Sequence, residues 1–221
     1  MKYDWKKTII KYPKRKHLTL EELDKIPYYD ENNNIIDNIH NERIEQYLAN
    51  DFVNPNNVVL ELGARYGTVS CVINNKLENP RNHIVFEPDN SVIDALMKNR
   101  KSHKSKFTIF NGIISNSKMK FIKDSYASTM EETINDDEAV KSWSLKEIYK
   151  ITKLNFDCLI ADCEGCLEKF FDENEIYIKN FKLIIFEADQ PQKCNYKKIK
   201  HKLLSWNFTC ILNGFCSVYV K

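Results

Sequence analysis

The sequence of 221 residues is poor in glycine and nearly balanced in charge. It has only 5 glycines, and its 33 basic and 31 acidic side chains leave a formal net charge of +2. A protein whose main role is to grip a nucleic-acid backbone usually shows a strongly basic domain, so the charge balance argues against that class. The scarcity of glycine gives weight to each one, because glycine is favoured where the backbone turns tightly or approaches a ligand.

Long apolar runs are also absent. No stretch of about 18 uncharged apolar residues occurs, so we expect neither a transmembrane helix nor a membrane partner. The first thirty residues carry Lys, Asp and Glu where a secretory signal needs an apolar segment, which predicts a cytoplasmic protein. The 7 cysteines are odd in number and mostly lie in apolar runs, which favours reduced, partly buried thiols. The oligomeric state stays open.

The pattern of apolar residues changes near residue 50. Residues 1–50 combine a basic start with two helical segments, near 19–23 and 39–50, and are expected to form an N-terminal helical extension. Thr19 followed by Glu22 predicts a capping box at the first of these helices. We interpret the basic residues of the start as a solvated tail rather than a substrate-binding arm.

Residues 51–221 alternate short apolar runs with amphipathic helices and are expected to form one catalytic domain. Strands are predicted near residues 58–62, 83–87, 107–110, 156–162, 182–187, 209–212 and 217–220, with a hairpin strand near 118–122. Helices are predicted near residues 68–77, 91–101, 166–171 and 196–206. Continuously apolar strands separated by helices predict a doubly wound, mostly parallel α/β sheet covered on both faces.

Two of the glycines frame the turn after the first predicted strand, in the segment 61–67 (ELGARYG). Ligands of doubly wound folds bind at the carboxyl ends of the strands, so this turn is a candidate nucleotide site. The next predicted strand ends in Glu87, where a carboxylate can accept hydrogen bonds from a ribose diol. The alternative is that the glycines only form a tight turn, and the position of Glu87 favours the binding site.

The residues around this turn distinguish between nucleotides. The sequence has no Gly-x-x-x-x-Gly-Lys-Ser/Thr loop, so it lacks a P-loop. A dinucleotide site prefers three glycines, whereas this turn has two and is preceded by Glu61, which would repel a pyrophosphate. An acid so placed would pair with the amine of S-adenosyl-L-methionine, and we therefore favour this cofactor over NAD.

Six segments in this order resemble the FkbM-type S-adenosylmethionine-dependent methyltransferases: 61–67 (ELGARYG), 86–88 (FEP), 111–115 (NGIIS), 144–148 (SLKEI), 162–165 (DCEG) and 185–187 (IFE). The resemblance covers about residues 57 to 190. It implies a class I methyltransferase (Rossmann-like) fold and O-methylation of a hydroxyl on a sugar, glycan or small metabolite. The cofactor-binding residues that it suggests are Glu61, Gly63, Ala64, Gly67, Glu87, Asn111 and Gly112, and from the residues of the same motifs we add Arg65, Tyr66, Pro88 and Asp162.

The sequence departs from the family pattern at four positions. The family usually has Asp at the position of Glu61, Asn at Arg65, Lys at Ile160, and Glu or Ala at Cys166. The changes at Arg65 and Ile160 alter the charge of the pocket floor. Arg65 is therefore itself a candidate for binding the methionine carboxylate.

Carboxylates follow the fourth and fifth predicted strands. Asp162, Glu164, Glu187 and Asp189 should converge, because the ends of adjacent parallel strands meet at one edge of a sheet. Crowded acids raise one another's pKa and create a base, or else invite a divalent cation. We predict Asp162, Glu164 and Glu187 as catalytic, with the first two preferred, and assign no metal ligand. The alternative roles are helix capping for Asp162 and loop anchoring for Glu187.

Other functions remain as alternatives. An Asn/Asp-Pro-Pro-aromatic loop is absent, and no glutamate follows Glu187 to complete a Lys-Asp-Lys-Glu tetrad, so nucleic acid is a less favoured acceptor. An RNA or cap ribose 2′-O-methyltransferase stays open, as does a binding subunit that has lost catalysis. Cys163 and Cys166 have metal-site or redox spacing but no second pair, which disfavours either role. The basic residues 197–202 favour a solvated face over a docking site.

Overall fold

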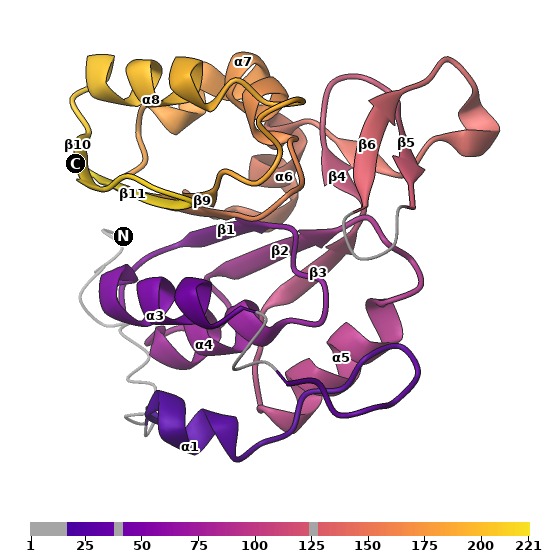
Figure 1. Ribbon diagram of the computed structural model, residues 1–221, viewed down its shortest axis with the longest axis vertical. Coiled ribbons are helices and arrows are strands. Elements are labelled where there is room, and N and C mark those ends of the chain that lie inside the picture. Colours follow the sequence, from indigo (N-terminus) through magenta and orange to yellow (C-terminus); the bar gives the residue numbers. More distant parts are fainter. Residues whose placement is uncertain (1–16, 38–41, 124–127) are drawn as a thin grey trace, which may run out of the picture.

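The structure is a computed structural model that describes residues 17–37, 42–123 and 128–221. Among these residues, seven strands form one central sheet in the order β10-β11-β9-β8-β1-β2-β3 (Figure 1). The strands are β1 (Val59–Leu62), β2 (His83–Glu87), β3 (Thr108–Asn111), β8 (Cys158–Ala161), β9 (Leu183–Glu187), β10 (Thr209–Leu212) and β11 (Cys216–Val220). β1, β2, β3, β8 and β9 run parallel, and β11 is antiparallel to both β9 and β10. The predicted doubly wound, mostly parallel sheet is confirmed.

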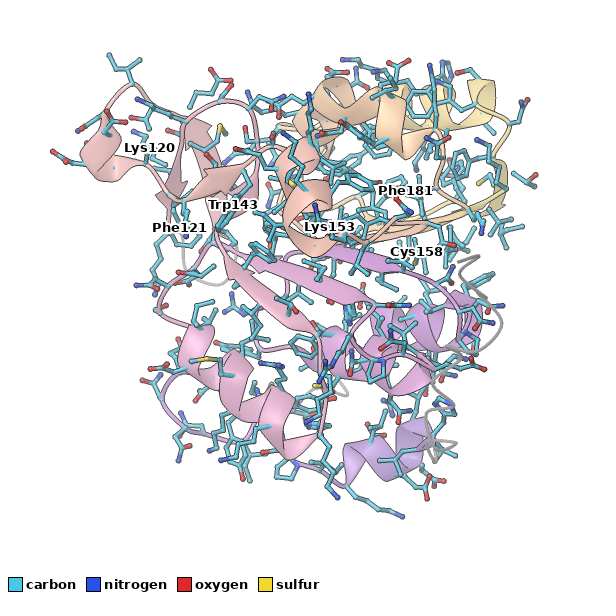
Figure 2. All side chains as sticks on the ribbon, turned by 180° about the vertical axis from the view of Figure 1, so that it is seen from behind. Lys120, Phe121, Trp143, Lys153, Cys158 and Phe181 are labelled. Atoms are coloured by element: carbon cyan, nitrogen blue, oxygen red, sulfur yellow. A yellow bond between two sulfur atoms is a disulfide. The ribbon has the colours of Figure 1, made fainter. Side chains whose placement is uncertain are left out.

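Helices cover both faces of the sheet (Figure 1). One face carries α1 (Leu20–Asp24), α3 (Arg43–Phe52), α4 (Thr68–Lys76) and α5 (Ile93–Ser102), and the other carries α6 (Leu145–Thr152), α7 (Leu167–Ile178) and α8 (Tyr196–Ser205). Successive strand residues point to opposite faces, so strands buried on both sides must be apolar throughout. Phe181 belongs to the core under α6 to α8, and Cys158 to the core under α3 and α4 (Figure 2).

The N-terminal segment packs into the same body. Thr19 and Glu22 form the predicted capping box at the start of α1. The second predicted helix is observed as α3, which runs on to Phe52 and buries Ala49 against the α4 side of the sheet. Ile39, at the predicted start of that helix, and the basic residues up to Lys16 lie outside the described residues.

A hairpin stands beside the sheet, near the carboxyl ends of β1 and β2 (Figure 1). Its strands β5 (Met119–Ile122) and β6 (Thr129–Glu132) are antiparallel, which confirms the predicted hairpin strand. A short parallel pair, β4 (Ile113–Ile114) and β7 (Ser142–Trp143), connects it to the sheet. The 3₁₀ turn η2 (Asp136–Glu138) lies between β6 and β7.

One helix is longer than predicted. The polar residues after Phe171 indicated an end there, whereas α7 continues to Ile178 across a kink at Asn174. Ile178 is completely buried, so tertiary packing extends the helix through a polar stretch. Within the described residues, no helix is both long and apolar enough to span a membrane.

Candidate active site

A cavity of about 750 Å³ lies at the carboxyl ends of β1, β2, β8 and β9. Doubly wound folds bind their ligands at this edge, and the volume falls in the range of about 300–1,000 Å³ common for small-molecule sites. The turns after the four strands form the floor, the hairpin β5–β6 contributes Met119, Phe121 and Met130, and α7 contributes Phe170. The sequence therefore brings its predicted motifs together around one cavity.

The turn after β1 is held between two neighbouring strands. Gly63 has φ +81°, and a Cβ atom there would lie 1.6 Å from the backbone oxygen of Asp162. Its N–H donates to the backbone oxygen of Phe86 at 3.0 Å. Only glycine permits this approach, so the turn presents Gly63, Ala64 and Arg65 to the cavity.

Glu87 ends β2 with a carboxylate fixed by backbone donors. Its oxygens accept from the N–H of Arg65 at 2.6 Å and the N–H of Asp89 at 2.7 Å. Burial raises its pKa to about 7, and the two backbone donors act against that rise. Each carboxylate oxygen has a second lone pair, so Glu87 can still accept hydrogen bonds from a ligand in the cavity.

Glu61 lies in the cavity floor, with both oxygens already in contact with protein groups. One accepts from the Ser70 hydroxyl at 2.9 Å, and the other lies 2.7 Å from Nε2 of His83. A cofactor amine that binds Glu61 as predicted would have to share the carboxylate oxygens with Ser70 and His83.

Three predicted binding residues do not line the cavity: Tyr66, Gly67 and Asn111. Tyr66 is buried, and its hydroxyl donates to Glu31. Gly67 is the N-cap of α4, and the Asn111 amide donates to the backbone oxygen of Glu87 at 3.0 Å. These residues support the turn and strand ends from behind, whereas Pro88 and Gly112 do line the cavity.

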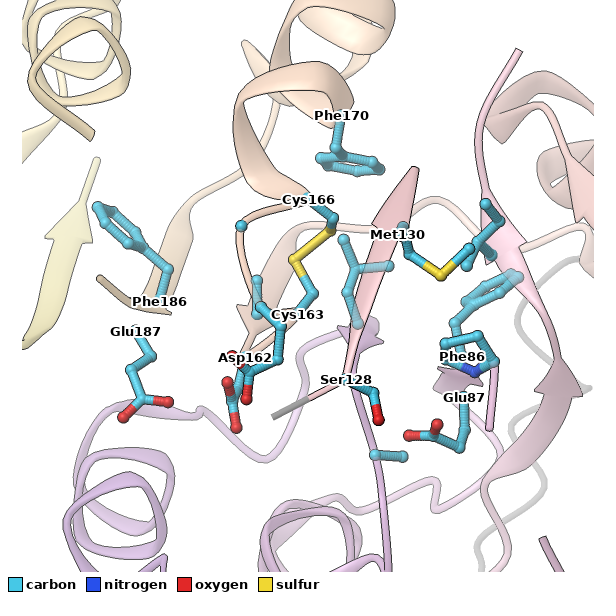
Figure 3. A pocket seen from close by; sticks show the side chains of 18 of the residues that line it. Phe86, Glu87, Ser128, Met130, Asp162, Cys163, Cys166, Phe170, Phe186 and Glu187 are labelled. Atoms are coloured by element: carbon cyan, nitrogen blue, oxygen red, sulfur yellow. A yellow bond between two sulfur atoms is a disulfide. The ribbon is translucent and has the colours of Figure 1, made fainter. Parts of the chain in front are cut away.

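The two ends of the cavity differ in chemistry (Figure 3). At the end that we call the Glu87 end, Glu87 lies beside Phe86, Ser128 and Met130. At the other, which we call the acid end, lie the predicted catalytic residues and a neighbouring acid, namely Asp162, Glu164, Glu187 and Asp189.

Asp162 and Glu187 form a carboxyl pair at the acid end. Burial raises the pKa of Glu187, and the adjacent Asp162 charge raises it further. Burial also raises the pKa of Asp162, while the hydrogen bond with Glu187 lowers it. Burial and the neighbouring charge therefore favour one proton held by the pair as a whole. The Oδ1 atom of Asp162 is buried and has no hydrogen-bond partner among the described residues.

The alternative role of Asp162 as a helix cap is not observed. The N-cap of α7 is Cys166, and this end of the helix has no side-chain cap hydrogen bond.

Glu164 and Asp189 are tied to α8 and to the loop before it. Glu164 accepts from the Gln190 amide at 2.8 Å, and Asp189 accepts from the Tyr196 hydroxyl at 2.9 Å. Burial raises the pKa of Glu164, and the nearby Asp189 adds to the rise. Oxygen atoms of Asp162, Glu164 and Asp189 all lie within 4.8 Å of one another.

Sequence reasoning missed the contribution of α3. Glu42, the N-cap of α3, and Glu45 in its first turn line the cavity, although both precede the first motif in the sequence. Burial raises the pKa of Glu42 to about 8, and the charge of Asp162 contributes. Glu45 accepts from the Cys216 thiol at 2.9 Å. An amphipathic helix with glutamates was visible in the sequence, but nothing there indicated which strand end it would reach.

The expectation of reduced thiols is wrong for one pair. Cys163 and Cys166 form a disulfide that lines the cavity, whereas the other five cysteines are free (Figure 3). The tight turn between β8 and α7 brings the two Cα atoms to 5.5 Å, within the range that a disulfide requires. The Cys-x-x-Cys spacing was the signal for this pair, and the absence of a second pair was no reason to set it aside.

The basic residues of α8 have acidic partners on α7. Lys198 contacts both Glu168 and Asp172, and Lys202 contacts Asp172. These pairs neutralise much of the charge that a docking site for an acidic acceptor would use.

No protein-family model and no curated protein matches this sequence. Among solved structures, the chain is similar to a precorrin-6y C5,15-methyltransferase from Geobacter metallireducens, with 13% identity over 90% of this chain and 96% of that chain and a TM-score of 0.51. An O-methyltransferase from Bacillus cereus matches with 13% identity over 81% and 80% and a TM-score of 0.49. A putative tRNA (m1A22) methyltransferase from Streptococcus pneumoniae matches with 13% identity over 80% and 72% and a TM-score of 0.48. At 13% identity the Geobacter likeness shows the fold alone, which is the Rossmann-like class I methyltransferase fold.

Proposed function

We propose that the protein is an S-adenosyl-L-methionine-dependent O-methyltransferase of the FkbM type. The observation that carries the proposal is a single cavity, at the strand ends of a class I fold, with a backbone-fixed carboxylate at one end and a proton-sharing carboxyl pair at the other. A sulfonium cofactor is cationic and carries a ribose, so both features complement it.

The residues of the cavity fit this cofactor. Glu87 would accept from the ribose hydroxyls, and Pro88 and Gly112 would flank the adenine. Gly63 and Ala64 would lie along the methionine part, with Arg65 for its carboxylate and Glu61 for its amine. The buried, unpartnered Oδ1 of Asp162 supports a hydrogen-bond-donating group at this point, which we assign to the acceptor hydroxyl, because an orphaned buried acceptor is costly.

When bound, S-adenosyl-L-methionine would supply an electrophilic methyl group for in-line attack by a hydroxyl. The chain's own part would be to align that hydroxyl and take its proton. Asp162 is the member of the carboxyl pair left ionised near neutral pH, so its Oδ1 can accept the proton. Glu187 holds its proton and hydrogen-bonds to Asp162, which fixes the orientation of the base. Glu164, whose pKa is raised to about 8, would hold its proton near neutral pH and donate a hydrogen bond at the same end.

The acceptor that we propose is a hydroxyl of a sugar, glycan or small metabolite. Its support is the resemblance to the FkbM motifs and the absence of nucleic-acid-specific motifs in the segment 162–165. The cavity volume of about 750 Å³ also favours a small acceptor over a polymer backbone.

Calorimetric titration with S-adenosyl-L-methionine and S-adenosylhomocysteine tests the first step. We expect both to bind, and Glu87→Gln to weaken each by at least about tenfold, because the charged acceptor of two ribose hydrogen bonds is lost. Glu138→Gln, at an exposed site in η2, is the matched control and should bind like the wild type. If neither compound binds to the wild type, the proposal is contradicted.

A methyl-transfer assay with radiolabelled cofactor tests the acceptor. We expect transfer to members of a panel of nucleotide sugars, oligosaccharides and small alcohols. Transfer to capped RNA alone would identify the ribose methyltransferase alternative. The remaining outcome is a protein that binds the cofactor but transfers no methyl group to any member of the panel. If a crystal structure then shows Asp162, Glu164 and Glu187 intact, the protein is a binding subunit that has lost catalysis.

A further inference from the structure

The disulfide between Cys163 and Cys166 lies in the wall of the cavity (Figure 3). Cys163 follows Asp162 at the end of β8, and Cys166 is the N-cap of α7. Both residues are partly exposed, so the sulfur atoms are within reach of a small molecule that enters the cavity. This disulfide is unusual as a structural bond, because it joins two cysteines whose sequence separation is only 3.

The short loop limits what this disulfide can do for global stability. In the chain-entropy account, a cross-link stabilises by restricting the unfolded chain, and the effect grows with loop length. The backbone turn is already closed by a hydrogen bond from the N–H of Cys166 to the oxygen of Cys163 at 3.1 Å. Opening the disulfide should therefore leave the fold intact and change the structure locally.

The turn that the disulfide spans contains Glu164, one of the predicted catalytic residues. The two residues between the cysteines both have left-handed backbones, with φ +51° at Glu164 and φ +89° at Gly165. This conformation is unfavourable for Glu164, because its Cβ crowds the following carbonyl oxygen. The cross-link over the turn helps to keep Glu164 there, with its carboxylate beside Gln190 and Asp189. Release of the cross-link would let Glu164 leave the left-handed region and move its carboxylate.

The remaining cysteines differ from this pair. Cys71, Cys158, Cys194 and Cys216 are buried free thiols, and burial raises the pKa of each. Thiols of this kind react slowly, because the thiolate is the reactive form. Cys210 is partly exposed but has no partner cysteine. Redox chemistry of the native protein is thus directed to Cys163 and Cys166.

We propose that Cys163 and Cys166 are a reversible thiol–disulfide site for a dithiol reductant, and that its redox state sets the conformation of the Glu164 turn. The consequence for methyl transfer rests on the function proposed above, whereas the redox site and the turn do not. In the reducing cytoplasm expected from the sequence, dithiol reductants are present and would open the disulfide.

The exchange balances without any further reactant. A thiolate of the dithiol attacks Sγ of Cys163, the protein S–S bond breaks, and the electron pair leaves on Sγ of Cys166. That sulfur lies at the amino end of α7, where the helix dipole favours a thiolate. The second thiol of the dithiol then attacks the mixed disulfide and releases Cys163. Two protons pass from the dithiol to the protein thiols, the dithiol becomes a disulfide, and the protein gains two electrons.

Thiol labelling of the full chain tests the redox site. The native protein is equilibrated with mixtures of reduced and oxidised dithiothreitol, labelled with iodoacetamide and analysed by peptide mass spectrometry. We expect the Cys163–Cys166 peptide to convert completely and reversibly between no label and two labels, while Cys71 and Cys158 become labelled only in denaturant. A pair that resists excess reduced dithiothreitol without denaturant, or that never forms a disulfide under oxidised dithiothreitol, would overturn the proposal.

Hydrogen–deuterium exchange tests the coupling to the turn, without need of a cofactor. On reduction we expect peptides covering residues 162–167 to exchange at least tenfold faster, with the strands β1 and β2 unchanged. A Cys163→Ser/Cys166→Ser double variant should exchange at the fast rate in both buffers, and Cys210→Ser should respond like the wild type. Equal exchange in oxidised and reduced wild type would overturn the coupling.

Calorimetry with S-adenosylhomocysteine separates this proposal from the proposed function. If the ligand binds, we expect similar Kd values in the two redox states and a rate of methyl transfer that differs by at least threefold, and equal rates would overturn the effect on the site. If it binds neither state, the proposed function fails, and the labelling and exchange results alone decide the redox site.

Discussion

The Glu87 end and the acid end of the cavity contain the same functional group, a partly or fully buried carboxyl, in two different settings. Glu87 is fixed by two backbone N–H donors and surrounded by apolar side chains. Asp162 and Glu187 instead bond to each other and crowd against further acids. Backbone donors fix a carboxylate in place for binding, whereas carboxyl groups that bond to each other hold a proton that can move. In the proposed function, the Glu87 end therefore binds the cofactor and the acid end takes the proton.

The two ends meet at Gly63, and the largest effect is expected there. In Gly63→Ala the new Cβ would lie 1.6 Å from the backbone oxygen of Asp162, so β1 and β8 must separate. We expect the free energy of unfolding, measured with urea, to fall by at least about 3 kcal/mol. In the control Gly214→Ala the nearest atom is 3.6 Å away, and the change should stay below about 1 kcal/mol. If Gly63→Ala and Gly214→Ala lower the free energy of unfolding equally, the close approach of Gly63 to Asp162 is not needed for the fold.

Substitution at the acid end should separate turnover from binding. We expect Asp162→Asn to lower kcat by about 100-fold or more, since it removes the proposed base, and Glu164→Gln to lower kcat because it removes the neighbouring carboxyl. Both should change the Kd of S-adenosylhomocysteine by less than about threefold. Glu87→Gln should show the opposite pattern. Steady-state kinetics and calorimetry measure the two quantities, and normal turnover in both acid-end variants would refute the assignment of the base.

The crowded acids should also make stability depend on pH. The folded-state pKa of Glu42 is raised to about 8, so its contribution to stability is complete below its unfolded pKa and is lost as the pH rises through about 8. Between pH 5 and pH 8.5 we expect the free energy of unfolding of the wild type to fall by about 2 kcal/mol more than that of Glu42→Gln.

Urea unfolding across that pH range measures the difference. Glu138→Gln removes an exposed carboxylate and should keep the wild-type slope. If the free energy of unfolding of the wild type and of Glu42→Gln depends on pH in the same way, Glu42 is not buried in its protonated form.

The smallest effect is expected from the apolar wall of the Glu87 end. Met130 from β6 lines the cavity, and Met130→Ala should raise the Kd of S-adenosylhomocysteine about fivefold, since part of an apolar side chain no longer covers the ligand. Met97 is 46% exposed on α5, and Met97→Ala is the control that should leave Kd unchanged. An unchanged Kd in Met130→Ala would place the ligand away from the hairpin.

The sequence could predict those parts of the site that depend on local pattern. The turn at 61–67, Glu87 and the acids after β8 and β9 each follow an apolar strand, and the ends of parallel strands meet at one edge. The sequence could not predict which side chains of a turn face the cavity, because neighbouring residues in a turn point in different directions. Tyr66 and Asn111 lie behind the wall for this reason.

Features that depend on tertiary packing could not be predicted in the same way. Glu42 and Glu45 reach the cavity because α3 packs across α4 and the strand ends, and no motif marks that contact. The helix α7 passes its predicted end because Ile178 finds a place in the core. The disulfide depends on two consecutive left-handed residues, of which only Gly165 is a residue that favours that conformation.

The pairing of β1 with β8 has a consequence for how the protein acquires its site. Val59 pairs with Cys158, and the side chain of Asn57 bonds to Asp157 across a sequence separation of 100 residues. β1, β2 and β3 can associate through short connections, whereas β8 must close a long loop before its contacts compensate for the lost chain entropy. We therefore expect the strands that carry Glu87 to gain protection from hydrogen exchange earlier in refolding than β8 and β9, which carry the acid end.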